Sequence, residues 1–488
     1  MIAMTRFHSH PCIHAPLTAI ASAVVLLAGC TVGPDFVRPT PDVPAHWSGV
    51  QAESTELGAW WSAFGDSTLN SLVERAVTSN LDLRAAMLRI EESRAQRDVT
   101  AAALWPRLSL EAAYSRQRVS ETTPTGALLK SAGGSHLPGA AGIGIPNPYG
   151  QFQLSGDASW EIDLFGRVRR SVEAADAGVQ VSVEDQHAVQ LSLVADVAQS
   201  YLALRGAQAR LQLAKENLAT VDELLELARE RRAAGLTSHI DVSNSSAQRS
   251  ATQADLPTFE LQITQNINQL SQLLAKPPEA LRAELAAAIA VPPAPPEVPV
   301  GLPAELARRR PDIRQAEANL HAATAQVGVA VADLFPRLTL SANGGYQSET
   351  AASLVEWASR FGSIGPTLTL PIFDRGKWKT VRLQNLRAQE AALTYQRTVL
   401  NALHEVENAL ASYAANQQRR ASLEATVVQD DEALQLSRQR YESGVGNFID
   451  VLNSQRTLQQ NQSLRLDNLT TVATDLVRLY RALGGGWQ

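Results

Sequence analysis

The chain has 488 residues, enough for roughly two or three ordinary domains or for one large elongated unit. Its residues are 45% hydrophobic but only 5% aromatic, and Ala, Leu, Gln, Glu and Arg are abundant, a composition that favours long helices. The 43 basic residues nearly balance the 49 acidic ones, giving a net charge of −6 without a long basic run, which argues against nucleic acid as the main partner.

The first predicted element is a secretory signal peptide over residues 1–29. Arg6 precedes an apolar run over residues 17–28 that is short for a membrane span and ends in small residues. The run continues into Leu27-Ala-Gly-Cys30, which resembles the bacterial lipobox. That resemblance implies that Cys30 is covalently lipidated and becomes the first residue of the mature protein. The alternative is an unmodified cysteine after an ordinary signal peptide.

The mature chain keeps Cys30 as its only cysteine, because Cys12 leaves with the signal peptide. No intrachain disulfide can then form, so stability must come from packing, including packing with other copies. No apolar run of about eighteen residues follows, so we expect no spanning helix in the mature chain. Thr31 replaces the Asp that the lipobox resemblance associates with inner-membrane retention, which favours the outer membrane.

The remaining sequence contains an internal duplication. Four segments recur in the same order, at an offset that falls from 230 residues (80 to 310) to 209 (235 to 444). The pairs are Asn80-Leu-Asp-Leu-Arg with Arg310-Pro-Asp-Ile-Arg, Leu104-Trp-Pro-Arg-Leu with Leu334-Phe-Pro-Arg-Leu, Asp163-Leu-Phe-Gly-Arg with Pro371-Ile-Phe-Asp-Arg, and Gly235 before His239-Ile-Asp-Val with Gly444 before Phe448-Ile-Asp-Val. We therefore predict a lipidated segment over 30–65, a first repeat over 66–275, a Pro-rich linker over 276–302 and a second repeat over 303–484.

Each repeat is predicted to begin with a helix, over about 66–104 and 303–334, that ends at Pro106 or Pro336. Two strands follow, and then a very long helix over 167–233 or 376–443. A glycine-containing turn leads to a return helix. Apolar residues three and four apart indicate a coiled-coil seam in the first long helix: Leu211, Ala214, Leu218, Val221, Leu225 and Ala228.

The four predicted strands alternate apolar and polar residues with a period of two. Their apolar faces carry Leu108, Leu110, Ala112 and Tyr114; Phe152, Leu154, Gly156, Ala158, Trp160 and Ile162; Leu338, Leu340, Ala342 and Tyr346; and Ile364, Leu368, Leu370 and Ile372. Four strands are too few to close a barrel, and open edges in a membrane would cost several kcal/mol per unpaired backbone group. Three copies would supply about twelve strands, within the range of outer-membrane barrels. The long loop over 119–149 should then face the outside.

With these features the chain resembles the outer-membrane factors, which are the TolC-like channels. Within them it resembles the lipoprotein branch that serves resistance-nodulation-division pumps. The segments that carry the resemblance are Cys30-Thr-Val-Gly-Pro-Asp-Phe, Trp60-Trp-Ser-Ala-Phe-Gly-Asp, Leu302-Pro-Ala-Glu-Leu-Ala-Arg-Arg-Arg-Pro-Asp-Ile-Arg, Tyr441-Glu-Ser-Gly and Ile449-Asp-Val-Leu. The implied fold is mixed but mainly α: a duplicated helix–β-hairpin–long helix–helix unit whose homotrimer forms a β-barrel continued by an α-helical coiled-coil tunnel.

The resemblance implies an outer-membrane efflux channel that is anchored by lipid and extends into the periplasm. Its partners would be a periplasmic adaptor and an inner-membrane resistance-nodulation-division transporter, which supplies the energy for passive conduction. Two alternatives stay open. One is a channel for type I protein secretion, and the other is a structural lipoprotein that spans the periplasm without conducting.

The helix-to-helix turns are the candidate gate, because they lie farthest from the strands. Asp241 and Asp450 should begin the return helices, where a carboxylate is favoured by unpaired N–H groups. The resemblance implies that Asp450 contributes to an acidic ring. The second carboxylate expected in this ring is replaced by Asn453 in this chain. The resemblance also implies that Tyr441 pairs with Asp241 in a network that ties the tip shut. The arginine expected in the second turn is replaced by Gly446. We hypothesise that opening costs less free energy as a result.

The residues expected to dock the adaptor lie in the two turns: Gly235, Leu236, Thr237, Gly444, Val445, Gly446 and Asn447. No other chemistry is indicated. The mature histidines are scattered without metal-ligand spacing, and no nucleophile elbow, HExxH motif or phosphate loop occurs. We therefore expect no enzyme activity, and no cofactor besides the lipid on Cys30.

Overall fold

The computed structural model describes residues 31–40, 43–47, 58–124, 126–127, 147–295, 298 and 300–487. Their contacts define two compact units. The first, which we call the strand unit, lies within Met1–Val37, Arg94–Gly178 and Leu320–Glu390. The second, the helical unit, lies within Arg38–Ser93, Val179–Asn319 and Ala391–Gln488. Cys30 and most of the 119–149 loop lie outside the described residues.

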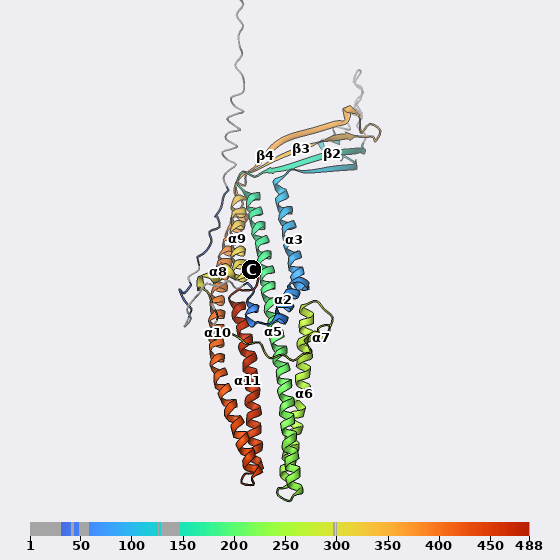
Figure 1. Cartoon of the computed structure of the whole chain (residues 1–488). Helices are drawn as coiled ribbons and strands as arrows, with labels where there is room; N and C mark the ends of the chain where they lie inside the picture. Colours follow the sequence, from blue (N-terminus) through green and yellow to red (C-terminus); the bar gives the residue numbers. More distant parts are fainter. Residues whose placement is uncertain are drawn as a thin grey trace, which may run out of the picture. The chain divides into compact units, whose positions relative to one another are not determined.

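The same order of elements occurs twice, as predicted (Figure 1). The first repeat contains α2 (Ser67–Ser79), α3 (Leu81–Ala101), β1 (Arg107–Gln117), β2 (Tyr149–Ile162), α5 (Arg167–Ala233) and α6 (His239–Leu273). The second contains α9 (Pro311–Ala332), β3 (Arg337–Ser348), β4 (Arg360–Thr369), α10 (Arg375–Glu442) and α11 (Phe448–Ala482). Short helices flank them: η1 (Trp60–Phe64), η2 (Ala102–Leu104), α7 (Arg282–Leu285), η3 (Pro303–Glu305), α8 (Leu306–Arg309) and η4 (Trp357–Ser359).

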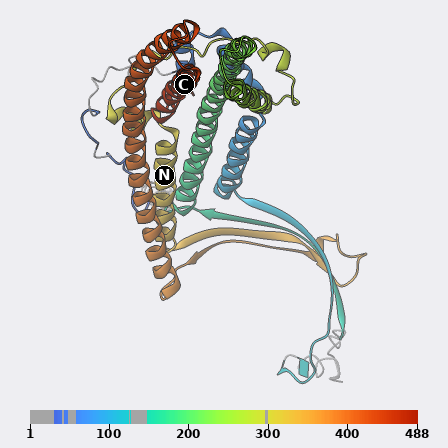
Figure 2. The same cartoon turned by 90° about the horizontal axis from the view of Figure 1, so that it is seen from below.

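The four strands form one antiparallel sheet in the order β1-β2-β3-β4. Figure 2 shows them leaving the helix ends side by side and curving together. The register brings the predicted apolar faces onto one side, since Ala112 pairs with Leu154, and Leu154 with Tyr346. On the other face the polar side chains form a ladder along β2, in which Gln153 donates to Ser155 Oγ (3.3 Å) and Ser155 donates to Asp157 (3.4 Å). The alternation in the sequence therefore gives an amphipathic sheet.

One strand is shorter than predicted. β4 ends at Thr369, which pairs with Arg337, the first residue of β3. Pro336 directly precedes Arg337 and Pro371 lies two residues after Thr369, and proline has no N–H to extend a ladder. Leu370 and Ile372 therefore lie beyond the sheet and do not belong to its apolar face.

The first predicted helix of each repeat is broken near its start. Asn80 leaves the helical conformation (φ −59°, ψ 133°) and separates α2 from α3, because its side chain caps the Leu83 N–H (2.9 Å). At the equivalent place Arg310 is extended (φ −77°, ψ 122°), because Pro311 disfavours the helical conformation of the residue before it. Among the described residues, none of the helices combines the length and the apolar character that crossing a membrane requires.

Two apolar clusters stabilise the helical unit. The larger one joins α2, α5, α6, α10 and α11, and its centre includes Leu72, Tyr201 and Leu476, all fully buried. The smaller one lies near the helix-to-helix turns. It consists of Leu224, Ala228, Tyr441, Phe448, Val451 and Leu452, so it contains residues of both repeats. The two α-hairpins of one chain, α5–α6 and α10–α11, are therefore packed together close to their turns.

Candidate functional site

The two helix-to-helix turns are built in the same way. Gly235 (φ 76°) and Gly444 (φ 80°) adopt the left-handed conformation that ends α5 and α10. In the first turn the Leu236 N–H donates to the Arg231 carbonyl (2.8 Å), and in the second the Val445 N–H donates to the Arg440 carbonyl (3.0 Å). The glycines recognised in the sequence thus terminate both long helices.

The return helices begin with different caps. Ser238 accepts from the Ile240 N–H (3.1 Å) at the start of α6, whereas Asn447 makes no side-chain cap at the start of α11. Asp241 and Asp450 both lie in the first turn, where the helix dipole favours a carboxylate. Asp241 also accepts a hydrogen bond from the Thr237 hydroxyl. Asp241 therefore has a local structural role, as its position after a glycine turn predicts.

Asp450 and Asn453 lie three residues apart on α11, and both are exposed. Residues at this spacing lie on one face of a helix, one turn apart. Val451 and Leu452, which lie between them, are buried in the cluster near the turns. The polar pair therefore faces away from that cluster, as a ring contributed by several chains requires.

The pair expected between Tyr441 and Asp241 is not formed within this chain. The Tyr441 side chain is buried (5% exposed), and its hydroxyl has no hydrogen-bond partner among the described residues. The Asp241 carboxylate is bound by Thr237 instead. The Tyr441 ring packs against the ring of Phe448, with centroids 5.2 Å apart.

Arg231, which the sequence analysis did not single out, reaches Tyr441 from the other hairpin. Its guanidinium donates to the Tyr441 carbonyl and lies over the Tyr441 ring, 4.4 Å from the centroid. Arg231 is in the last turn of α5 and is separated from Tyr441 by 210 residues. The signal in the sequence was a basic residue at a helix C-terminus, which is too common to identify a partner in the other repeat.

The residues predicted to dock an adaptor are mostly exposed. Leu236 (68%) and Val445 (71%) occupy equivalent places in the two turns, whereas Thr237 is half-buried against Asp241. Ile240 and Ile449, also equivalent, are exposed as well, although the sequence analysis did not name them. The remaining predicted positions are the exposed Gly235, Gly444 and Asn447 and the half-buried Gly446. Each turn thus presents the same apolar pair to its surroundings.

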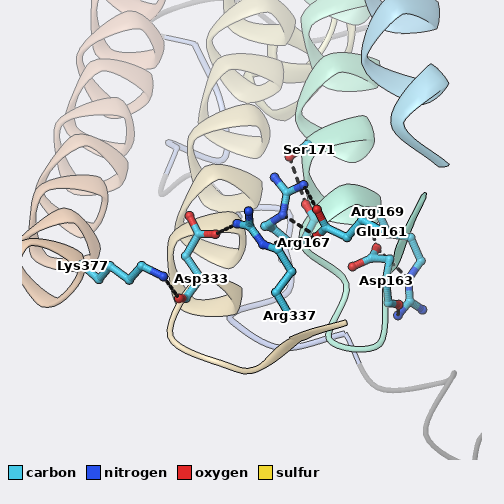
Figure 3. A network of polar contacts seen from close by, with 8 residues as sticks. All are labelled: Glu161, Asp163, Arg167, Arg169, Ser171, Asp333, Arg337 and Lys377. Atoms are coloured by element: carbon cyan, nitrogen blue, oxygen red, sulfur yellow. Dashed lines mark hydrogen bonds and ion pairs between the residues drawn. The ribbon is translucent and has the colours of Figure 1, made fainter. Parts of the chain in front are cut away.

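A second polar site lies where the strands meet the helices (Figure 3). Glu161, at the end of β2, accepts two hydrogen bonds from Arg167 (2.8 and 2.7 Å). This bonding raises the pKa of Arg167 against the opposing effect of burial. Arg337 bonds Asp333 (2.9 Å), and Lys377 donates to the Asp333 carbonyl (2.8 Å). Charged residues from β2, α5, β3 and α10 therefore form a network at this junction.

The segment after residue 30 is docked on the strand unit. The Val32 N–H donates to the Phe165 carbonyl (3.2 Å), and Arg170 binds Asp35 (2.5 Å). Gly33 (φ 92°) lies so close to Gly328 that a Cβ at residue 33 would be 2.5 Å from the Gly328 Cα. The segment over 31–37 is therefore held beside the junction of β2 and α5.

An amphipathic four-stranded sheet, duplicated long α-hairpins and paired glycine turns define the class of periplasm-spanning outer-membrane channels. The model of the outer membrane efflux protein family matches residues 72–276 and 302–485. The chain belongs to this family. The protein is similar to the outer membrane protein OprJ of Pseudomonas aeruginosa, with 34% identity over 94% of each chain.

Two solved structures show the same fold. The outer-membrane channel OprN has a TM-score of 0.82 and 33% identity, over 94% of this chain and all of that one. The MtrE outer membrane channel of Neisseria gonorrhoeae, solved in its open state, has a TM-score of 0.78 and 30% identity, over 94% of this chain and 99% of that one. These findings confirm the predicted mainly helical channel fold and an outer-membrane efflux channel, which is a passive transport protein and not an enzyme.

Proposed function

We propose that this chain is the outer-membrane subunit of a tripartite efflux system and passively conducts small molecules to the outside. The energy would come from an inner-membrane resistance-nodulation-division transporter, which is joined to the channel by a periplasmic adaptor. The observation that carries this proposal is the amphipathic sheet attached to paired α-hairpins, because a structural lipoprotein that only spans the periplasm has no use for a polar sheet face. The polar side chains along β2 would line water, and the apolar face would meet lipid.

The proposed assembly is a homotrimer. β1 and β4 each have one edge without a partner in the described sheet, and such edges are costly in a membrane unless another strand pairs with them. Three copies of a four-stranded sheet would give about twelve strands, enough to close a barrel. In the helical unit, Leu81 and Leu88 on α3 and Leu393 and Leu400 on α10 are more than half exposed and seven residues apart. This spacing suits helix packing between copies.

The depth of the sheet in the membrane would be set at the junction shown in Figure 3. Charged side chains are costly in hydrocarbon, so the Glu161–Arg167 network marks where the lipid-facing part ends. Trp105 (74% exposed), two residues before β1, and Trp378 (66%), next to Lys377, belong to the strand unit. Exposed tryptophan is typical of the headgroup level of a membrane.

The lipid on Cys30 would enter the membrane at this level. Residue 31 directly follows the cysteine, and Thr31 packs on Gly166, where an added Cβ would be 2.7 Å from the Thr31 side chain. Mass spectrometry of the mature N-terminal peptide should show a diacylglyceryl cysteine, and an unmodified peptide would rule the lipid out.

The adaptor would dock at the two turns, where Leu236 and Val445 are exposed at equivalent positions. Permeating ions would be selected next to the turns, at a ring of Asp450 side chains with one from each copy. A ring of like charges favours counter-ions. The direct test of conduction is to insert the purified protein into planar lipid bilayers. Discrete, cation-preferring conductance steps are expected, whereas a protein that inserts and never conducts would favour the structural lipoprotein.

A further inference from the structure

The two repeats differ at the turn between the second strand and the long helix, where their sequences match as Asp163-Leu-Phe-Gly-Arg and Pro371-Ile-Phe-Asp-Arg. In the first repeat this turn is covered. The Phe165 ring stacks on Phe335, with centroids 4.9 Å apart, and the Phe165 carbonyl accepts from the Val32 N–H (3.2 Å). In the second repeat, by contrast, Ile372 and Phe373 are 91% and 86% exposed. Among the described residues, nothing covers the second turn as the segment over 31–37 covers the first.

The charges at the start of the two long helices differ in the same way. In the first turn of α5 every arginine binds a carboxylate: Arg167 binds Glu161, Arg169 binds Asp163, and Arg170 binds Asp35 and Glu173. In α10 the stretch over 375–389 contains no acidic residue, but it contains Arg375, Lys377, Lys379, Arg382 and Arg387. Lys377 donates to the Asp333 carbonyl, which is a neutral group (Figure 3). The second repeat therefore keeps the cations of this place without the carboxylates.

We call Arg375, Lys379 and Arg382 the cationic face of α10. They are four and three residues apart, so they lie on one side of the helix. All three are exposed, and none makes a hydrogen bond or an ion pair within the part of the chain that the structure describes. Arg375 also lies in the first turn, where the helix dipole disfavours a positive charge. The carboxylate of Asp374 is occupied by two backbone N–H groups of that turn (2.9 and 3.2 Å).

Exposed apolar side chains flank the cationic face. Ile372 and Phe373 precede it, and Trp378, 66% exposed, lies between Arg375 and Lys379 in the sequence. Exposed apolar and aromatic side chains beside Lys and Arg are typical of segments that lie at a membrane surface. Clustered Lys and Arg in such segments attract the negative charge of anionic phospholipids. The surface around the start of α10 therefore fits a lipid that combines acyl chains with a negative headgroup.

A second copy of the chain is a poorer match for this surface. In a closed barrel the free edge of β4 would pair with β1 of another copy, and antiparallel pairing would place the start of β1 beside the end of β4. The residues over 94–107 that lead into β1 carry three arginines and one aspartate. Arg107 is exposed and has no ion pair among the described residues. Another copy would thus bring more positive charge to this place and no counter-charge.

We propose that the cationic face of α10 binds the phosphate group of an anionic phospholipid in the periplasmic leaflet of the outer membrane, with Ile372 and Phe373 against its acyl chains. This inference deepens the proposed function, on which it rests for the presence of a membrane at this level. In both repeats an anionic group then lies beside the start of the long helix. The first repeat uses carboxylates of the chain, and the second uses a bound lipid.

The test measures lipid binding by native mass spectrometry of the full-length, detergent-solubilised protein, titrated with phosphatidylglycerol or with phosphatidylethanolamine. The variant Lys379→Gln/Arg382→Gln removes two charges of the cationic face. The matched control is Arg397→Gln/Arg419→Gln, which removes two exposed arginines farther along α10 that also have no polar contact among the described residues. Melting temperature and oligomeric mass are recorded for each protein, so that a folding defect is recognised.

The proposal predicts that the parent binds phosphatidylglycerol more tightly than phosphatidylethanolamine. The Lys379→Gln/Arg382→Gln variant should bind phosphatidylglycerol at least about tenfold more weakly, with its affinity for phosphatidylethanolamine unchanged. The control variant should behave like the parent. Raising the salt concentration should reduce the preference of the parent, because the cationic face is exposed and salt screens exposed charges.

Three outcomes would overturn the proposal. The first is equal affinity of the parent and the Lys379→Gln/Arg382→Gln variant for phosphatidylglycerol. The second is full displacement of phosphatidylglycerol by excess inorganic phosphate, which would reveal a site for free anions and not for lipid. The third is a variant that keeps its lipid affinity and loses its oligomeric mass, which would assign the cationic face to a contact between copies.

Conductance in planar bilayers separates this inference from the proposed function. A parent protein that binds phosphatidylglycerol selectively and never conducts would keep the lipid site and reject the channel. A parent protein that conducts and binds both lipids equally would reject the lipid site alone.

Discussion

Gly33 shows how a single residue can fix the segment over 31–37 on the strand unit. Its positive φ of 92° and the approach of Gly328 both exclude a side chain. The conformation alone disfavours other residues by about 1–3 kcal/mol. Gly178, in contrast, has nothing within 4 Å of an added Cβ and lies inside α5.

We predict that Gly33→Ala releases the segment from the strand unit. Hydrogen exchange at the Val32 amide, which donates to Phe165, should become faster because docking is weakened by about 1–3 kcal/mol. Gly178→Ala is the control and should leave this exchange unchanged, while helix α5 gains up to about 1 kcal/mol. Equal exchange in the two variants would mean that the segment is held by other contacts.

Substitutions at Asp450 and Asn453 test the proposed charge ring by removing a carboxylate and by adding one. Asp450→Asn removes the carboxylate from each copy, so the ratio of cation to anion permeability should fall toward one. Asn453→Asp adds a carboxylate one turn away on the same exposed face, and the ratio should rise. Both are measured as reversal potentials in a salt gradient. If neither substitution moved the reversal potential, the narrowest point would lie elsewhere.

At the scale of elements, Asn80 joins α3 to the return helix of the same repeat. Its carbonyl oxygen caps the Leu83 N–H, and its amide donates to the Leu273 carbonyl at the end of α6, each at 2.9 Å. The side chain is buried, so water cannot replace either bond. This double role explains why the helix is broken at residue 80.

Asn80→Ala should therefore lower the free energy of unfolding by about 2–4 kcal/mol, from the lost cap and one unsatisfied carbonyl. Asn80→Ser keeps a capping oxygen and loses the amide donor, so it should cost less. Chemical denaturation of the detergent-solubilised protein measures both. Equal losses for the two variants would show that capping contributes nothing here.

Tyr201 links α5 to the start of α2 by donating to Asp66 (2.5 Å). Asp66 also caps α2, by accepting from the Thr68 and Leu69 N–H groups. Burial, followed by the hydrogen bond to Asp66, raises the pKa of Tyr201 from 10.0 to about 12. The neutral phenol is thus favoured in the folded state, so its contribution is fully present below pH 10 and is lost as the pH rises toward 12.

We expect Tyr201→Phe to be less stable than the parent at pH 8 by about 1–3 kcal/mol, because Asp66 loses a partner. Between pH 10 and 12 the parent should lose up to about 3 kcal/mol more than the variant, so the two unfolding curves converge. Parallel curves across this range would contradict the assignment of the alkaline loss to Tyr201.

At the scale of the whole molecule, much of the architecture could be predicted because it repeats. The two-residue period of the strands, the proline-free run over 167–233 and the glycines at 235 and 444 each specify local structure, and the duplication doubles every signal. The strand end at Thr369 was missed because pairing stops where both strands meet a proline. The breaks at Asn80 and Arg310 shifted the helix boundaries. The Asn80 cap on Leu83 and the proline after Arg310 mark both breaks locally, and bonds to the distant carbonyls of Leu273 and Ala482 hold the two side chains.

The candidate site could be predicted only in part. Local sequence places Asp241 and Asp450 at helix starts, since each follows a turn glycine and lies in the first turn of a return helix. The partner of Tyr441 could not be found this way, because Arg231 lies 210 residues away and its contact depends on how the hairpins pack. Contacts of that kind arise from tertiary structure and leave no periodic signal.

The central claim is that the tip of this channel docks on an adaptor that leads to an inner-membrane transporter. We would place a photo-crosslinking residue at the exposed Asn447, irradiate living cells and identify the adducts by mass spectrometry. Gln418, exposed in the middle of α10, is the control position. The account predicts that residue 447, and not residue 418, captures a periplasmic adaptor that co-purifies with a resistance-nodulation-division transporter. Recovery of only self-adducts or peptidoglycan-associated proteins from residue 447 would contradict it and favour a structural lipoprotein.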